Sequence, residues 1–352
     1  MVKLSGVVMF SNDGGGNVVK GEVEIEVDDD ITELDLTRRR LLSVANFGSL
    51  PNLETLILRW NLIKKIENFS GLHCLTHLSL YDNQITKIEN LTNLPNLSIL
   101  DLSYNRITKI EGLETLKNLK ELYLTRNKLS KIEGLSCLSS LELLELADNR
   151  IGKIENLEEL TTLKKLFLGA NQITTIEGLS TLKELTVVSF IGNAIRDIEG
   201  LGTLTKLTDL AVSQNGLTRI AGLTNNIELT TLDLNDNRIE KIENLQHLVN
   251  LKALWIRNNK VRFESIYSNA LKRPTNHRLQ IANWSEVAYL NRLPSLKNVA
   301  FEMNPIYSSQ HFYRNRIREI LPRVRIIDGF PANWISGDPW QALSEGSEGS
   351  CV

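Results

Sequence analysis

The chain has 352 residues, of which 42% are apolar and 23% are charged. Lys and Arg number 40 against 42 Asp and Glu, a formal net charge of -2, so we expect no general electrostatic attraction to nucleic acid or to anionic lipid. Three cysteines (Cys74, Cys137 and Cys351) are too few and too scattered for a disulfide framework or a thiolate metal site. No apolar stretch is long enough to span a membrane, and we therefore expect an intracellular soluble protein.

The first 30 residues differ in composition from the rest of the chain. They carry three consecutive glycines (14–16) and three consecutive aspartates (28–30). Such polar, glycine-rich termini bury little apolar surface. We predict an acidic, mobile arm over residues 1–30, with a short strand at Glu22–Val27.

A repeat of 22 residues occupies residues 31–259, which gives about eleven coils. Its most regular feature is an asparagine that recurs without slippage at Asn61, Asn83, Asn105, Asn127, Asn149, Asn171, Asn193, Asn215, Asn237 and Asn259. A Leu-x-Leu frame or its apolar counterpart precedes each asparagine, and Ile or Leu follows it two residues later in nearly every coil. The first coil, around Leu34 and Leu36, has Arg39 in place of the asparagine, as a degenerate terminal coil would.

This pattern resembles the short form of the leucine-rich repeat. The resemblance implies an α/β-type solenoid: a superhelix of 22-residue coils with a concave parallel β-sheet and convex 3₁₀ or extended turns. In each coil the two leucines of the strand point inward. The asparagine satisfies buried backbone groups where the chain turns, because an unpaired group there would cost roughly 1–3 kcal/mol.

After Asn259 the repeat is interrupted. Residues 260–289 lack the frame and are predicted to be an irregular insertion. A last coil returns at 290–304, and the pattern that ends Leu321-Pro322, Val324 and Ile327-Asp328 predicts a helix at roughly 311–320 and a closing turn. We therefore expect a last coil with a C-terminal helical cap over 290–330, followed by a loose tail over 331–352.

One row of residues is expected to point onto the concave surface of the sheet. Because side chains alternate along a strand, the residue between two inward leucines points onto the concave surface. This central row comprises Ile57, Ser79, Asp101, Tyr123, Glu145, Phe167, Ser189, Ala211, Asp233, Trp255 and Ala300. Acidic and aromatic side chains interleave in it, and aromatic residues are enriched at the hot spots of protein interfaces. We predict that partner binding involves Asp101, Tyr123, Glu145, Phe167, Asp233 and Trp255.

With the repeat, the cap and the central row together, the chain resembles the SDS-twenty-two-like regulatory subunit of type 1 serine/threonine protein phosphatase. Several coils carry Ile-Glu-Asn or Ile-Glu-Gly after the second isoleucine, as that family does; examples are Ile88-Glu89-Asn90 and Ile110-Glu111-Gly112. The resemblance covers about residues 31–328. It implies a non-enzymatic protein of the nucleus or cytoplasm, monomeric on its own, that binds the phosphatase catalytic subunit and uses no cofactor.

Carried over position by position, the resemblance assigns the contacts to the six residues predicted above. Tyr123 stands where the family has Phe. Two positions depart further: Ala253 replaces an expected Glu, and Ala300 replaces an expected Tyr. Both lie beside the 260–289 insertion, so the C-terminal part of the contact surface is where this chain departs from the family.

Other functions remain open from the sequence. A ribonucleoprotein or other intracellular scaffold would share the repeat, although the spliceosomal relative has about half as many coils. Internalin-like adhesion proteins share the repeat length, but we identify no secretory signal or anchor. An enzyme is not expected, because too few residues lie outside the solenoid for a catalytic domain, and neither catalytic residues nor a metal site are predicted.

One short motif also matches phosphatase regulators. Lys260-Val261-Arg262-Phe263 resembles their docking motif. However, Val261 stands two residues after Asn259 and is predicted to be buried in its coil, and matches this short recur by chance.

Overall fold

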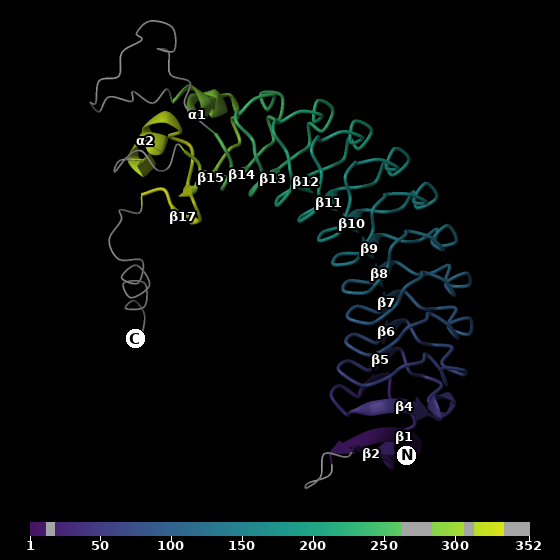
Figure 1. Cartoon of the computed structure of the whole chain (residues 1–352). Helices are drawn as coiled ribbons and strands as arrows, with labels where there is room; N and C mark the ends of the chain where they lie inside the picture. The colour runs from purple at the N-terminus through teal and green to yellow at the C-terminus, as the bar shows by residue number, and fades with distance from the viewer. Residues whose placement is uncertain (12–17, 262–283, 306–312, 334–352) are drawn as a thin grey trace, which may run out of the picture.

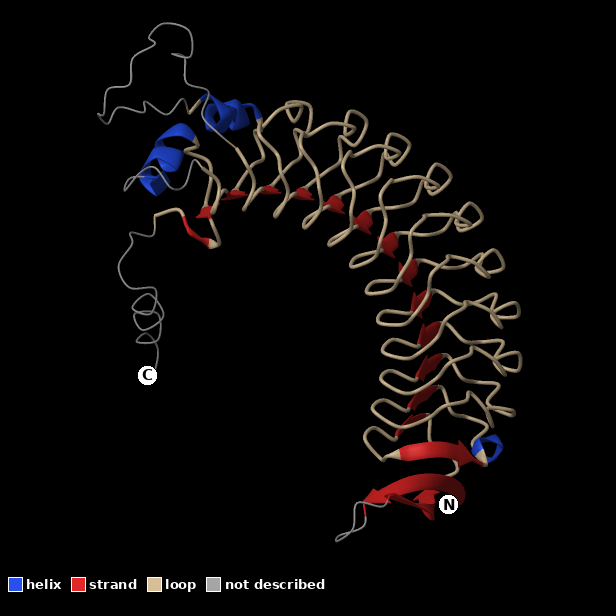
Figure 2. Cartoon of the chain, in the orientation of Figure 1, coloured by secondary structure: helices blue, strands red, loops and turns tan. Residues whose placement is uncertain are grey.

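A computed structural model describes residues 1–11, 18–261, 284–305 and 313–333. The repeat forms one curved solenoid in which each coil contributes a short strand to the inner side of the arc (Figures 1 and 2). The strands are β3 (Glu33–Asp35), β5 (Thr55–Ile57), β6 (His77–Ser79), β7 (Ile99–Asp101), β8 (Glu121–Tyr123), β9 (Leu143–Glu145), β10 (Lys165–Phe167), β11 (Val187–Ser189), β12 (Asp209–Ala211), β13 (Thr231–Asp233), β14 (Ala253–Trp255), β15 (Asn298–Ala300), β16 (Ile326–Ile327) and β17 (Phe330–Pro331). All neighbours pair in parallel except the last two strands.

The register of the sheet results directly from the 22-residue repeat. Equivalent residues of successive coils lie opposite each other, so that Leu100 pairs with Leu122 and Asp101 with Tyr123. The central leucine of each strand is buried, and so are the apolar residues of the turns after the asparagine. From β5 to β14 these convex segments are turns without a helix (Figure 2). The structure thus confirms the predicted leucine-rich solenoid.

The recurring asparagines are buried or half-buried and link adjacent coils. Asn105 is typical: its Oδ1 accepts the N–H of Ile85 at 2.9 Å, and its Nδ2 donates to the carbonyls of Leu80 at 2.9 Å and Leu102 at 3.1 Å. The carbonyl of Leu80 also accepts a bond from Asn83 of its own coil at 3.1 Å. Each such carbonyl is therefore shared by two asparagines, and the asparagines form a continuous ladder along the solenoid. We call them the ladder asparagines.

The chain adopts a left-handed conformation at two positions of the coil. One immediately precedes the ladder asparagine, as at Trp60 with φ 52°. The other is the last residue of the Ile-Glu-Asn or Ile-Glu-Gly triplet. Where it is Asn, as at Asn90, the side chain donates to a carbonyl of the preceding coil. Where it is Gly, the backbone packs against that carbonyl; a Cβ on Gly200, the last residue of Ile198-Glu199-Gly200, would lie 2.4 Å from the oxygen of Ile176. The triplet therefore has a structural reason independent of any partner.

The predicted mobile arm is wrong. Two antiparallel strands, β1 (Val2–Ser11) and β2 (Val18–Val27), pair as a hairpin, and β1 also pairs with β4 (Leu41–Ala45). The predicted strand at 22–27 is part of β2. The acidic residues of β2 alternate with Val and Ile, so the glutamates are exposed while the apolar side chains are half-buried. Leu4 and Val8 of β1 are buried over the first coil, and a short 3₁₀ helix, η1 (Phe47–Ser49), comes after that coil. The hairpin thus closes the N-terminal end of the core.

The C-terminal end is closed as predicted. A helix α1 (Ser285–Tyr289) and a 3₁₀ turn η2 (Leu290–Arg292) lead into β15, and α2 (Tyr313–Ile320) matches the predicted helix. Asp328 accepts the N–H of Phe301 at 2.8 Å and that of Glu302 at 3.2 Å, which ties the closing turn to the last coil. Most of the predicted insertion at 260–289 and of the predicted tail at 331–352 lies outside the described residues.

Candidate protein-interaction surface

Four of the six predicted contact residues lie side by side. Asp101 pairs with Tyr123, Tyr123 with Glu145, and Glu145 with Phe167, on the successive strands β7 to β10. Asp233 and Trp255 form a second pair on β13 and β14. The small residues Ser189 and Ala211 separate the two groups. The structure therefore places the predicted residues in two blocks on one concave sheet.

These residues are not equally accessible. Trp255 is the most open, with 38% of its surface exposed, while Tyr123, Glu145 and Phe167 are half-buried. Asp101 differs from the expectation of an open side chain, because only 8% of its surface is exposed. Arg59 covers it, with its Nη2 3.5 Å from the Asp101 Oδ2.

A polar network explains the burial of Asp101. Ser79 Oγ donates to its Oδ2 at 3.1 Å, and the N–H of Ser103 donates to its Oδ1 at 3.1 Å. Arg59 Nε in turn donates to Ser79 Oγ at 2.8 Å. The carboxylate of Asp101 is thus satisfied within the chain and has less to offer a partner than Glu145.

The other polar groups of the central row keep more capacity. The Tyr123 hydroxyl donates to Glu121 Oε2 at 2.6 Å; burial, together with this carboxylate, raises the pKa of the phenol well above its ordinary range. Glu145 accepts a bond from the Thr125 hydroxyl at 2.9 Å. Burial also raises the pKa of Asp233, against the opposing effect of a hydrogen bond from the Asn235 N–H at 3.0 Å. A basic group of a partner that paired with the Asp233 carboxylate would offset the free-energy cost of its burial.

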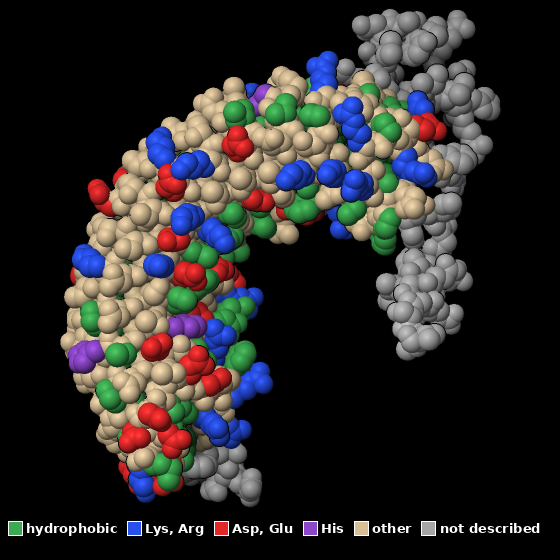
Figure 3. All heavy atoms as spheres, turned by 180° about the vertical axis from the view of Figure 1, so that it is seen from behind, with side chains coloured by type: hydrophobic (Ala, Val, Ile, Leu, Met, Phe, Trp, Pro, Cys, Tyr) green, Lys and Arg blue, Asp and Glu red, His purple; other side chains and the backbone are tan. Residues whose placement is uncertain are grey.

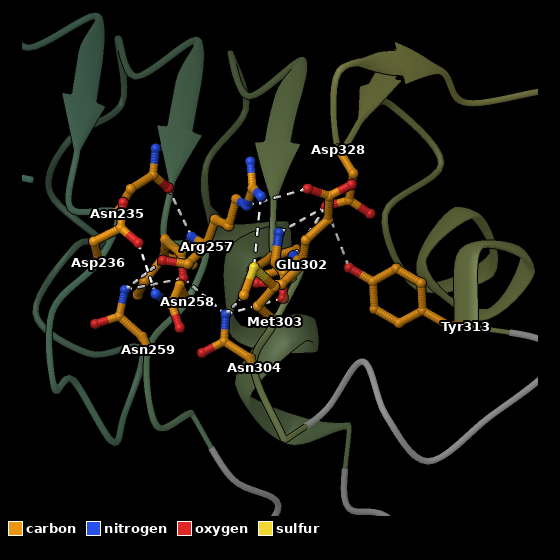
Figure 4. Close-up of polar contacts among 12 residues, drawn as sticks. Asn235, Asp236, Arg257, Asn258, Asn259, Glu302, Met303, Asn304, Tyr313 and Asp328 are labelled. Atoms are coloured by element: carbon orange, nitrogen blue, oxygen red, sulfur yellow. Dashed lines mark hydrogen bonds and ion pairs between the residues drawn. The ribbon is translucent and has the colours of Figure 1, made fainter. Parts of the chain in front are cut away.

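The C-terminal end of the face contains a polar cluster that was not predicted from the sequence (Figure 4). Arg257 Nε lies 3.3 Å from Glu302 Oε2, and the Arg257 backbone N–H donates to Asn235 Oδ1 at 2.7 Å. Burial, followed by repulsion from Asp328, raises the pKa of Glu302. The cluster is not apparent in the sequence because the insertion separates Arg257 from Glu302 along the chain. Ala253 is buried in the same region, so the face has no acidic side chain at the position where the resembling family has one.

The motif at 260–263 lies only partly within the described residues. Val261 is fully buried, and its N–H donates to Asn304 Oδ1 at 3.2 Å, as predicted for a residue of the coil; Arg262 and Phe263 lie outside the described residues. Within the described part of the chain there is no group of three or more His, Cys, Asp or Glu that could hold a metal ion. In the same part, no helix is both long and apolar enough to cross a membrane.

Comparison with known families agrees with this geometry. The family model described as "Leucine Rich repeats (2 copies)" matches residues 51–93, 95–137, 139–181 and 227–270. This chain is a leucine-rich-repeat protein. A search of curated proteins found none that matches it.

Solved structures share the fold of this leucine-rich-repeat protein at low identity. An internalin (inlF) of Listeria monocytogenes is 24% identical, with a TM-score of 0.63 over 87% of this chain and 88% of the internalin. A leucine-rich-repeat protein of Leptospira interrogans is also 24% identical, with a TM-score of 0.62 over 80% of this chain and 73% of that protein. Internalin C2 of Listeria monocytogenes is 30% identical over 55% of this chain and 85% of its own, with a TM-score of 0.50. These similarities establish the solenoid, which is a fold suited to protein binding, and they identify no particular partner.

Proposed function

We propose that this leucine-rich-repeat protein is a non-enzymatic regulatory subunit that binds the catalytic subunit of type 1 serine/threonine protein phosphatase. Binding would occur through the concave face, inside the cell, in the nucleus or the cytoplasm. The regulator would modulate or target the phosphatase, and the metal chemistry would remain that of the phosphatase. The coarser conclusion, that the protein binds another protein, rests on the fold alone.

One observation carries the proposal. The residues that the resemblance assigns to phosphatase contacts lie on the same parallel β-sheet, as a block from Tyr123 to Phe167 and a second block at Asp233 and Trp255. The two blocks lie three strands apart (β10 to β13), or ~14 Å at the usual strand spacing. Two anchoring points at this separation suit a globular partner that fills the concavity. Exposed aromatic residues on a rigid sheet lose little entropy when they dock, which favours them as anchors.

The burial of Asp101 refines the proposal. A carboxylate that is already paired with Arg59 gains little from a partner cation, whereas Glu145 and Asp233 have no ion pair within 4.0 Å among the described residues. We therefore assign the electrostatic part of binding to Glu145 and Asp233 and the apolar part to Phe167 and Trp255.

The test is a titration of the purified chain against the phosphatase catalytic subunit. We expect Trp255→Ala and Phe167→Ala each to weaken binding about thirtyfold, since truncation of an interface anchor typically costs ~2 kcal/mol or more. The matched control is Ser189→Ala, a half-buried residue of the same row that has little bulk to lose. Its affinity should equal that of the unmodified chain.

The outcome decides between this function and the alternative of a scaffold for another partner. If the unmodified chain does not bind the catalytic subunit, the phosphatase assignment is wrong and a scaffold with another partner is favoured. If the chain binds but both aromatic variants bind as well as the Ser189 variant, the central row is not the contact surface.

A further inference from the structure

The N-terminal half of the solenoid carries a second surface that shares no residue with the central row. It is formed by the residues immediately before and after each ladder asparagine in the coils of β5 to β9, and by the residues before and after Arg39, which takes the asparagine position in the coil of β3. The chain turns away from the sheet at these residues, and we call this surface the N-terminal rim. Three aromatic residues stand on or beside it: Trp60, Tyr81 and Tyr104. Ring centroids lie 5.7 Å apart between Trp60 and Tyr81 and 4.7 Å apart between Tyr81 and Tyr104.

Arginine side chains cover these rings. Arg38 lies 4.4 Å above the centroid of Trp60, and Arg126 lies 5.0 Å from the centroid of Tyr104. Such cation–π contacts hold the guanidinium groups in place. The Nε of Arg126 donates to Asp148 at 2.6 Å, whereas Arg38 has no ion pair within 4.0 Å among the described residues. The arginine and aromatic side chains thus form a row, here called the aromatic line, that is already ordered in the free protein, so that little conformational entropy is lost when a partner binds. Trp60 is 41% exposed, so the line is open to solvent.

The rim is strongly basic, unlike the chain as a whole. Its exposed cations are Arg38, Arg40, Arg106, Arg126, Lys128 and Arg150, and its exposed anions are Asp82 and Asp148. Asp148 is already paired with Arg126 at 2.6 Å. Among the described residues, Arg106, Lys128 and Arg150 have no ion pair within 4.0 Å. Figure 3 shows Lys and Arg side chains, interspersed with hydrophobic ones, along the inner edge of the N-terminal half of the arc.

The equivalent positions in the C-terminal half lack these features. From the coil of β10 to that of β14 they hold Ala170, Gln172, Gly192, Ala194, Gln214, Gly216, Asp236, Arg238, Asn258 and Lys260. No aromatic residue is present there, and two cations stand against one anion. The repeat therefore does not require the aromatic and basic character of the N-terminal rim.

We propose that the N-terminal rim is a docking surface for an extended, acidic segment of a protein partner. Charge complementarity selects an anionic occupant, since free guanidinium edges bind carboxylates in a bidentate manner. The aromatic line provides an apolar surface for the aliphatic parts of such a segment. From the coil of β3 to that of β9 the rim spans about 24 Å, which matches about seven residues of extended chain.

The geometry favours a protein segment over single-stranded nucleic acid. Nucleic-acid binding of this kind needs open ring faces on which bases stack. Here a guanidinium already covers Trp60 and another covers Tyr104. Carboxylates would add to this arrangement, whereas stacked bases would have to displace the arginines.

The test uses a fluorescein-labelled peptide of about ten residues in which Glu and Leu alternate, and an oligothymidylate of the same charge, each titrated against the full chain without phosphatase. The rim variant is Arg106→Ala/Arg150→Ala. Its matched control is Arg238→Ala/Lys260→Ala, which removes the same charge from the positions after the ladder asparagines in the C-terminal half. We expect the rim variant to bind the peptide about tenfold more weakly and the control to change affinity less than about twofold.

A third variant, Trp60→Ala, tests the aromatic line, with circular dichroism as a folding check; we expect a loss of about fivefold or more for the peptide. Equal losses in the two double variants would mean general charge attraction and would overturn the proposal, as would the absence of peptide binding. Tighter binding of the oligothymidylate than of the peptide, weakened in Trp60→Ala, would assign the rim to nucleic acid instead. None of these results depends on whether the chain binds a phosphatase.

Discussion

The ladder asparagines offer a direct test of what holds the coils together, and Asn149 in the middle of the solenoid is the clearest position. Only 9% of its surface is exposed. Its Oδ1 accepts the N–H of Leu129 at 3.0 Å, and its Nδ2 donates to the carbonyls of Leu124 and Leu146, both at 3.0 Å. Asn149→Ala removes all of these bonds at once.

The lost bonds are not equivalent. The carbonyl of Leu124 keeps its bond from Asn127, and that of Leu146 keeps its bond from Asn171. Only the N–H of Leu129 is left without a partner, which costs about 1–3 kcal/mol, and the loss of a second donor to each carbonyl adds up to ~1 kcal/mol. We expect the variant to lose about 1–4 kcal/mol of unfolding free energy, or roughly 1–5 °C in Tm for a chain of this size.

The assay is thermal and denaturant unfolding of the purified chain, followed by circular dichroism. The matched control is Asn93→Ala, an exposed asparagine of the convex turn, which should change the unfolding free energy by no more than about 0.5 kcal/mol. If the two variants show equal, small shifts, the shared hydrogen bonds do not stabilise the solenoid and the reasoning fails.

Three further predictions concern other parts of the chain. Burial raises the pKa of Asp233 above the ordinary Asp value of 3.8, so the stability of the fold is greatest when Asp233 is protonated and falls as pH rises through its folded-state pKa. Asp233→Asn should therefore be more stable than the unmodified chain at neutral pH and no more stable below pH 3.8. Urea unfolding at both pH values measures this difference. Gly222→Ala should destabilise by at least about 1–2 kcal/mol because its φ is +77° and a carbonyl blocks the added carbon, whereas Gly152→Ala, with nothing within 4 Å, should be neutral in the same melts. Leu4→Ala should lower the unfolding free energy by about 2–4 kcal/mol because Leu4 is fully buried by the hairpin. If its Tm equals that of the exposed control Lys3→Ala, the hairpin contributes no stability.

The repeat period made most of the fold predictable. Once the 22-residue spacing is recognised, the position of each strand, the place of each ladder asparagine at the turn and the direction in which the central row points can all be deduced, because every coil repeats the same local structure. The hairpin was missed because its overall acidic composition concealed the alternation of Glu with Val and Ile, and because its pairing with residues 41–45 is not visible in local sequence.

The candidate surfaces were only partly predictable, for a related reason. The central row was found by treating each coil alone, whereas the burial of Asp101 depends on Arg59 and Ser79 from the two preceding coils. In the aromatic line of the rim, Trp60 and Tyr104 stand at one position of the repeat and Tyr81 stands at another. An alignment of the repeats therefore does not show the three residues at one common position. Contacts between coils that use different repeat positions become visible only when the coils are stacked.

The way in which the two ends are closed has a consequence for how copies of the chain behave in solution. A parallel ladder of identical coils is self-complementary: the last strand of one copy could accept the first strand of the next, and filaments could grow head to tail. Here the long sheet ends on its C-terminal side in an antiparallel pair, β16 with β17, and on its N-terminal side the hairpin of β1 and β2 forms a separate three-stranded sheet with β4, next to the edge strand β3. The outer strand β2 exposes glutamates along its length, and like charges repel a second copy at that edge. Strand addition by a second copy is thereby discouraged at both ends of the solenoid, while the interior keeps a uniform repeat.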